Sequence, residues 1–242
     1  MKNTALYITK AAKREAHVLH PKALNIYIKH LNYLSRGALL LQQFSPEEQA
    51  DMIASGLEPG ANLGYDTFGS TSKRTFPKVF NEMCVRNGLG DRELTVNGIL
   101  EACTKAVEIG FAPPYILFFR THTPVKTRSV FGVAILGKAI SGLIQACKKL
   151  AKDDGQEYQK VGNWPWVAWW PWDEMFNQIT ADVDENQELT VLGEDFTGWD
   201  QSLRYDDFHF IEKLNFTLKP CYQWINLTLE KSDVWVGPNR IK

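Results

Sequence analysis

The spacing of apolar residues predicts that the first part of the chain is mainly helical. Large apolar side chains recur every three or four positions from Leu24 to Leu34, and we expect this helix to end near Gly37. A second helix is expected to begin at the capping box Ser-Pro-Glu-Glu of residues 45–48 and to close at Gly56. This pattern predicts two amphipathic helices within the first 60 residues.

The middle of the chain predicts a loop followed by two more helices. Residues 57–75 are rich in Gly, Ser and Thr, which favours a loop, and a helix is expected over 96–109, stopped by Gly110. The second of these helices carries an apolar stripe of Val133, Leu136, Ile140, Leu143, Ile144, Cys147 and Leu150. Its C-terminal end holds Lys148, Lys149 and Lys152, which suit either the helix dipole or contacts to RNA.

Between these helices, the pattern changes to that of a hairpin. Residues 115–119 are aromatic and apolar, 121–127 are polar around a central proline, and 129–133 are again β-prone. We expect a finger-like hairpin whose tip carries Arg120, Lys126 and Arg128. Three cations on one tip suit a triphosphate, because each can donate charge-assisted hydrogen bonds. An ordinary solvated basic loop is the alternative.

Near residue 195, two acids follow a predicted buried strand over 189–192. This places Asp195 at the C-terminal end of the strand, where ligands bind in α/β layers, and a carboxylate there suits Mg²⁺. Asp200, about one turn later, is expected to face the same cleft, ahead of a helix over 205–219 that stops at Pro220. The alternative is a solvated strand-to-helix turn with Asp200 as N-cap.

Both segments have counterparts in one family. The string Asp195-Phe-Thr-Gly-Trp-Asp200-Gln-Ser-Leu-Arg204 resembles motif A of viral RNA-dependent RNA polymerases, and Lys126-Thr-Arg128-Ser-Val resembles motif F. Motif F precedes motif A by 67 residues, from Arg128 to Asp195, a plausible gap for that family. Thr71-Ser72 is similar to motif G, and the two longer stretches most resemble the picobirnavirus-like group.

The resemblance implies an α+β fold, with a helix-rich fingers region over 1–187 and the beginning of a right-hand polymerase palm over 188–242. The finger at about 115–133 would line the channel through which nucleotides enter. Arg128 would pack over the incoming nucleotide, and Lys126 would meet its triphosphate beside Arg120. Asp195 would bind the catalytic Mg²⁺ ions, with Mn²⁺ as an alternative, and Asp200 would sense the ribose 2′-hydroxyl.

The implied partners are RNA template and product, nucleoside triphosphates and viral capsid protein, in the host cytoplasm or virion interior. The family also needs motif B, with its Ser-Gly, and motif C, Gly-Asp-Asp, and neither occurs here. Two-metal phosphoryl transfer needs carboxylates from motifs A and C. We therefore expect a partial polymerase that is inactive alone. An unrelated Mg²⁺-dependent phosphotransfer enzyme and a non-catalytic RNA-binding or structural protein remain open.

The composition limits the number of domains but does not identify a function. With 242 residues, 44% of them hydrophobic, the chain can bury the core of one or two domains. Residues 1–150 hold 19 Lys and Arg and 11 Asp and Glu, whereas residues 151–242 hold 8 Lys and Arg and 17 Asp and Glu. This asymmetry suits a protein that binds a polyanion with its basic part and a metal with its acidic part.

The remaining features concern the cell compartment and one unusual segment. The four cysteines form no Cys-x-x-Cys pair, which favours a reducing compartment over a zinc site or a disulfide framework. The sequence lacks a signal peptide and a membrane-spanning run, so we expect a protein that is not secreted. The tryptophan-rich stretch 164–172 suits an aromatic core wedge better than base stacking.

Overall fold

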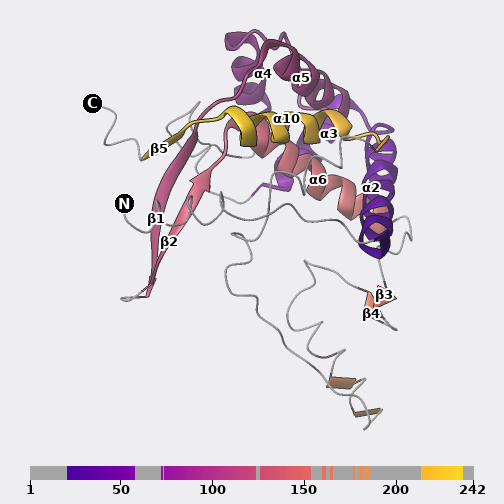
Figure 1. Ribbon diagram of the computed structural model, residues 1–242. Coiled ribbons are helices and arrows are strands. Elements are labelled where there is room, and N and C mark those ends of the chain that lie inside the picture. Colours follow the sequence, from indigo (N-terminus) through magenta and orange to yellow (C-terminus); the bar gives the residue numbers. More distant parts are fainter. Residues whose placement is uncertain are drawn as a thin grey trace. The chain divides into compact units, whose positions relative to one another are not determined.

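The computed structural model of the chain describes residues 21–57, 72, 74–123, 126–153, 160–161, 164–165, 177, 180–181, 184–185 and 214–236 (Figure 1). In this part of the chain the fold is mixed α+β and dominated by helices, as the sequence predicts at that coarse level. Contacts divide the chain into two compact units, Met1–Gln156 with Arg204–Lys242, and Glu157–Leu203. The division into fingers and palm at residue 187 stays a prediction.

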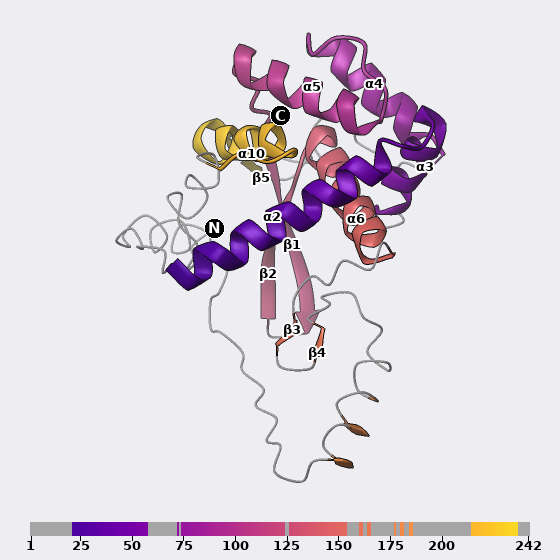
Figure 2. The ribbon, with the colours of Figure 1, turned by 90° about the vertical axis from the view of Figure 1, so that its right-hand side faces the viewer.

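The longest of the described helices, α2 (Pro21–Leu41) and α6 (Ile135–Asp153), pack directly against each other (Figure 2). The prediction that the first helix ends near Gly37 is wrong, because α2 continues to Leu41. A Cβ at Gly37 would overlap the backbone of Cys147, so the glycine allows the close approach of two helices instead of capping one. The Tyr33 hydroxyl donates to the Lys148 carbonyl oxygen at 2.8 Å across the same contact.

Three shorter helices complete the helical layer, and α6 contacts all of them. Helix α3 (Pro46–Ser55) begins at the predicted capping box and ends at Gly56, and α5 (Val96–Ile109) ends at Gly110 with φ 70°. Both predictions are confirmed. Helix α4 (Phe76–Arg86) was not predicted, although Phe76 and Phe80 are fully buried. The predicted stripe is confirmed at Leu136, Ile140, Leu143 and Cys147, which lie in the core. Ile144 and Leu150 are half-buried, and Val133 lies before the start of α6.

The sheet has the order β2-β1-β5 and carries the predicted hairpin. Strands β1 (Tyr115–Thr123) and β2 (Lys126–Gly132) pair antiparallel, and β5 (Val234–Val236) pairs parallel with the start of β1. The predicted hairpin is confirmed. The loop predicted over 121–127 is wrong at both ends, because its β-branched threonines continue the ladder as far as the pair Thr123–Lys126.

Helix α10 (Lys219–Lys231) corrects another prediction. Pro220 was expected to stop a helix over 205–219, but it lies in the first turn of α10, where its missing N–H has no partner to lose. Residues 214–218 form no helix, and 205–213 lie outside the described residues. Trp224 on α10 is buried, and its Nε1 donates to the Phe111 carbonyl oxygen at 2.9 Å, which fixes α10 beside the end of α5.

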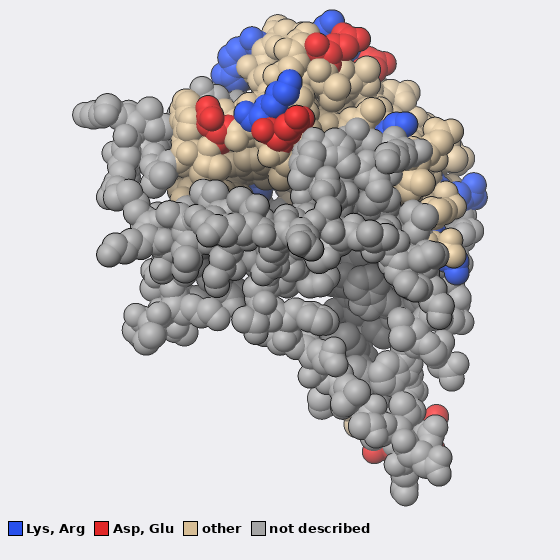
Figure 3. All heavy atoms as spheres, in the orientation of Figure 1, with Lys and Arg blue, Asp and Glu red and all other residues tan. Residues whose placement is uncertain are grey.

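The unit Glu157–Leu203 contains a two-stranded antiparallel ladder of β3 (Lys160–Val161) and β4 (Trp164–Pro165). The rest of the predicted tryptophan wedge lies outside the described residues. Among the helices that the structure describes, none has the length and apolar character that a membrane crossing needs. Side chains of both signs lie over the helices on the face in Figure 3, whereas α2 contains no Asp or Glu.

Candidate functional site

The hairpin of β1 and β2 holds the three predicted nucleotide-binding cations in one ladder. Arg120 and Arg128 are cross-strand partners, and Lys126 pairs with Thr123 beyond a register irregularity at 121–123. Cross-strand partners are neighbours in a sheet, with Cβ atoms ~5 Å apart, so two of these positions are brought together by the fold. The tip of the hairpin is therefore shorter than predicted. Arg120 and Arg128 lie within the paired strands, before the tip. The side chains of 119–129 lie outside what the structure describes.

The base of the hairpin is held by the core of the unit. Ile116 and Leu117, adjacent residues on opposite faces of β1, are 1% and 2% exposed, so both faces of the sheet are covered there. The Tyr115 hydroxyl hydrogen-bonds the Thr228 hydroxyl on α10 at 2.7 Å, and burial raises the pKa of Tyr115. The first part of the hairpin, residues 115–117, is therefore fixed to the core, and we call it the root. Side chains that bind a ligand need such support to stay in position.

Gly132 at the end of β2 supports the same root. A Cβ at this position would lie 2.8 Å from Cε2 of Phe118, so a side chain here would displace the Phe118 ring on the neighbouring strand. The Phe118 ring is thereby packed over the last residue of β2, while Val130 nearer the tip is exposed. The hairpin is buried at its root and open to solvent farther along.

The two predicted acids, Asp195 and Asp200, lie outside the described residues, and so does the strand predicted before them. Within the described ranges, no group of three or more His, Cys, Asp or Glu side chains is arranged to hold a metal ion. The predicted Mg²⁺ site therefore stays a prediction that depends on Asp195.

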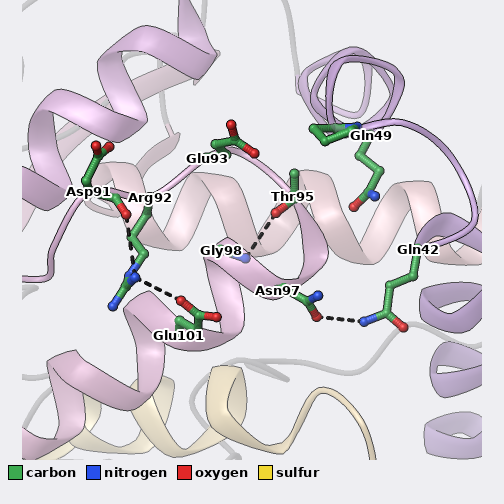
Figure 4. A pocket seen from close by; sticks show the side chains of 10 residues that line it. Gln42, Gln49, Asp91, Arg92, Glu93, Thr95, Asn97, Gly98 and Glu101 are labelled. Atoms are coloured by element: carbon green, nitrogen blue, oxygen red, sulfur yellow. Dashed lines mark hydrogen bonds and ion pairs between the residues drawn. The ribbon is translucent and has the colours of Figure 1, made fainter.

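A polar cavity of about 370 Å³ lies where the end of α2, the start of α3, residues 91–95 and the start of α5 meet (Figure 4). Its hydrogen bonds hold the fold: Gln42 Nε2 donates to Asn97 Oδ1 at 2.8 Å, and Gly98 N donates to Thr95 Oγ1 at 3.1 Å. Gln49, which is buried, accepts from Val96 N at 3.1 Å. Gln49 and Thr95 satisfy the first N–H groups of α5, so their polarity has a structural explanation.

Charged residues at the same cavity form an ion pair. Arg92 Nη1 lies 2.9 Å from Glu101 Oε2, and the Arg92 Nε donates to the Leu89 carbonyl oxygen at 3.2 Å. Asp91 and Glu93 are exposed beside this pair. Because the only cation on the cavity wall is already paired, the cavity has no cation to offer an anionic ligand, and we assign it no role in nucleotide binding.

The four cysteines converge although they are far apart in sequence. All are free and buried, and Cys103 Sγ donates to Cys221 Sγ at 3.9 Å between α5 and α10. Burial raises the pKa of Cys84 and of Cys147 to about 12, and burial followed by the bond to Cys221 raises that of Cys103. Such thiols stay protonated and pack as small apolar side chains. Spacing alone gave no sign of this convergence.

Comparisons with protein-family models, curated proteins and solved structures find no match for this chain. The resemblance to viral polymerases therefore depends on the short strings at 126–130 and 195–204.

Proposed function

We propose that the chain is part of an RNA-dependent RNA polymerase, and that the hairpin of β1 and β2 binds the triphosphate of the incoming nucleotide. The observation that carries the proposal is the pair of motif-like strings in the family's order, Lys126-Thr-Arg128-Ser-Val and then Asp195 to Arg204. The cross-strand pairing of Arg120 with Arg128 supports it, because two arginines at neighbouring positions can share one polyphosphate.

In this proposal the chain's residues have separate roles. Arg120, Lys126 and Arg128 bind and orient the triphosphate, and the described root of the hairpin keeps their strands in register. Asp195 holds Mg²⁺, which neutralises charge on the phosphates, and Asp200 recognises the ribose hydroxyl. RNA template and product are the macromolecular partners. A complete two-metal site also requires a carboxylate from motif C, which the 242 residues do not contain.

Nucleotide binding to the 242-residue chain tests the role of the hairpin. Arg128→Ala should weaken binding of a fluorescent ATP analogue roughly 10- to 100-fold, because a hydrogen bond to a charged group contributes about 1.5–3 kcal/mol. Arg128→Lys keeps the charge but loses the fork geometry of the guanidinium. Its affinity for the ATP analogue should therefore lie between that of Arg128→Ala and that of the unmodified chain. The control is Arg74→Ala, which removes one exposed arginine in the segment before α4.

The melting temperature of each variant separates binding from folding. If Arg128 contributes only to binding, its removal should change the stability of the chain by no more than ~0.5 kcal/mol. If Arg128→Ala binds the nucleotide like the unmodified chain, or if it only lowers the melting temperature, the arginine is structural and the proposal loses its main support.

A further inference from the structure

The chain contains the dipeptide Asn-Gly twice, at Asn87-Gly88 and at Asn97-Gly98. In this dipeptide the backbone nitrogen of the glycine can attack the side-chain amide carbon of the asparagine. Glycine favours the attack because it has no side chain to shield its nitrogen and because its backbone turns freely. The structure holds the two dipeptides in different surroundings, so their reactivity should differ.

The first dipeptide, Asn87-Gly88, forms the turn that ends α4. Leu89 N donates to the Cys84 carbonyl oxygen at 2.8 Å and Gly88 N donates to the Val85 carbonyl oxygen at 3.2 Å, which is the Schellman arrangement. Gly88 has φ 72° and is exposed, and a Cβ there would meet no atom within 4 Å. The glycine therefore has free space around it.

The peptide group between Asn87 and Gly88 can rotate as a unit. Such a rotation changes ψ of Asn87, which is 12°, and φ of Gly88 in opposite directions, and glycine tolerates either sign of φ. It breaks the bond from Gly88 N, and the Asn87 side chain must also leave the Met83 carbonyl oxygen, to which Nδ2 donates at 2.9 Å. Helix ends open in this way more readily than core segments. The reactive geometry can therefore be reached without unpacking α4.

The second dipeptide, Asn97-Gly98, lies in the first turn of α5 and is closely packed. Gly98 N donates to Thr95 Oγ1 at 3.1 Å. Gly98 is buried, a Cβ there would overlap the Glu93 carbonyl oxygen, and the neighbouring Val96 is fully inaccessible to solvent. Rotation of this peptide group requires the start of α5 to leave the core, which costs far more free energy than opening a helix end.

We propose that Asn87 is a site of spontaneous deamidation and that the fold protects Asn97. The Gly88 nitrogen loses its proton to hydroxide and bonds to Asn87 Cγ, the Cγ–Nδ2 bond breaks, and the amide nitrogen takes a proton from water and leaves as ammonia. Water then opens the cyclic imide at either carbonyl carbon, which gives aspartate or isoaspartate. The reaction needs only water and the chain itself, so it does not depend on the proposed function.

The product should loosen the end of α4. The new carboxylate only accepts hydrogen bonds, so it loses the bond to the Met83 carbonyl oxygen and places a negative charge beside that oxygen. It also lies at the C-terminal end of α4, where the helix dipole disfavours negative charge. Isoaspartate has the same charge and lengthens the main chain at the turn. Deamidation at Asn87 therefore weakens the turn that ends α4.

The two dipeptides can be compared within one sample. The folded 242-residue chain is incubated at mildly alkaline pH, digested at acidic pH and mapped by mass spectrometry, where each conversion adds about 1 Da. A second sample is incubated in concentrated urea. In urea the two asparagines should convert at similar rates, because the flanking structure is lost. In the folded chain Asn87 should convert at least about tenfold faster than Asn97.

Two variants complete the test. Asn87→Gln should abolish conversion at that position, because the longer side chain would have to close a larger ring, and should leave the rate at Asn97 unchanged. Asn87→Asp reproduces one product and should lower the melting temperature by roughly 2–4 °C. Equal rates at Asn87 and Asn97 in the folded chain would overturn the proposal. So would an Asn87 that stays intact in the folded chain while the urea sample converts completely. An unchanged melting temperature of Asn87→Asp would overturn the effect on α4.

Discussion

Replacing Gly37 with alanine should raise the helix propensity of α2 but worsen its packing against α6. The structure indicates which of the two effects is larger. Alanine is better than glycine in a helix interior by about 1 kcal/mol, so propensity alone predicts a more stable chain. At Gly37 the new methyl group would overlap the carbonyl group of Cys147, which is backbone and cannot rotate away. The two helices would have to separate by roughly an ångström, and close-packed interiors resist such shifts.

The packing cost should exceed the propensity gain. Adding a methyl group to a well-packed core costs about 1–3 kcal/mol, and the high end applies here because the obstacle is a main-chain group. We expect a net loss of about 1–2 kcal/mol in the free energy of unfolding, which corresponds to a melting temperature lower by roughly 2–8 °C for a chain of this size. Thermal and urea unfolding followed by far-ultraviolet circular dichroism would measure it.

Gly137→Ala is the matched control, because Gly137 lies inside α6 and its new Cβ would meet only side-chain atoms, the nearest being Val133 Cβ at 3.2 Å. This variant lies in the first turn of α6, so its propensity gain is smaller, but it avoids the clash with a main-chain group, and its stability should stay within ~0.5 kcal/mol of that of the unmodified chain. If Gly37→Ala proves equally stable, the close contact between α2 and α6 does not exist in solution, and the reasoning is refuted.

Three further outcomes are expected. Burial and, second, the Lys148 ammonium lower the pKa of His30 from 6.5 to about 4. The unfolded chain therefore takes up this proton first, and stability is lost as pH falls from 6.5 to 4, by about 1–2 kcal/mol after solvent screening. His30→Gln should flatten that part of the pH dependence of the melting temperature, and an unchanged profile would exclude His30 as its cause. The 242-residue chain should show no RNA synthesis with homopolymer template, four nucleotides and Mg²⁺ or Mn²⁺, because one of the two carboxylates is missing; template-dependent product would refute the expectation that the chain holds only part of the catalytic site. In an enzyme that also supplies motifs B and C, Asp195→Asn should nearly abolish incorporation, whereas Asp200→Asn should keep some activity and lose its preference for ribonucleotides over deoxyribonucleotides. Full ribose preference in Asp200→Asn would refute the assignment of that role.

Local chemistry explains which elements could be predicted from the sequence. The capping box at Ser45 forms as expected, with Glu48 Oε2 accepting from Ser45 N at 2.9 Å, and Gly110 adopts the positive φ that its place after α5 requires. These signals lie within a few residues of the helix end that they specify. The hairpin and the α6 stripe are likewise encoded in short windows.

The errors occur where a residue serves a partner that is distant in sequence. Gly37 has the appearance of a helix end, and only the position of Cys147, 110 residues later, gives it another purpose. Pro220 suits the start of a helix as well as its end, and the choice depends on the packing of Trp224 beside α5. The candidate site follows the same rule: the cations of the hairpin were predicted from a short string, but the pairing of Arg120 with Arg128 depends on the register of β1 and β2.

The parallel pairing of β5 with β1 has a consequence for how the protein is made. Tyr115 N donates to the Asp233 carbonyl oxygen at 2.8 Å, and Ile116 pairs with Trp235, so the edge of β1 that β5 covers gains this partner only after residue 236 has been synthesised. At a typical 5–20 residues per second, the roughly 110 residues between the two strands take about 6–20 s to translate. Throughout that interval the nascent hairpin presents an aromatic strand without its final neighbour, and such an edge can pair with another chain. The yield of folded protein should therefore depend on the speed of translation between β1 and β5, a property that no equilibrium measurement on the finished chain would reveal.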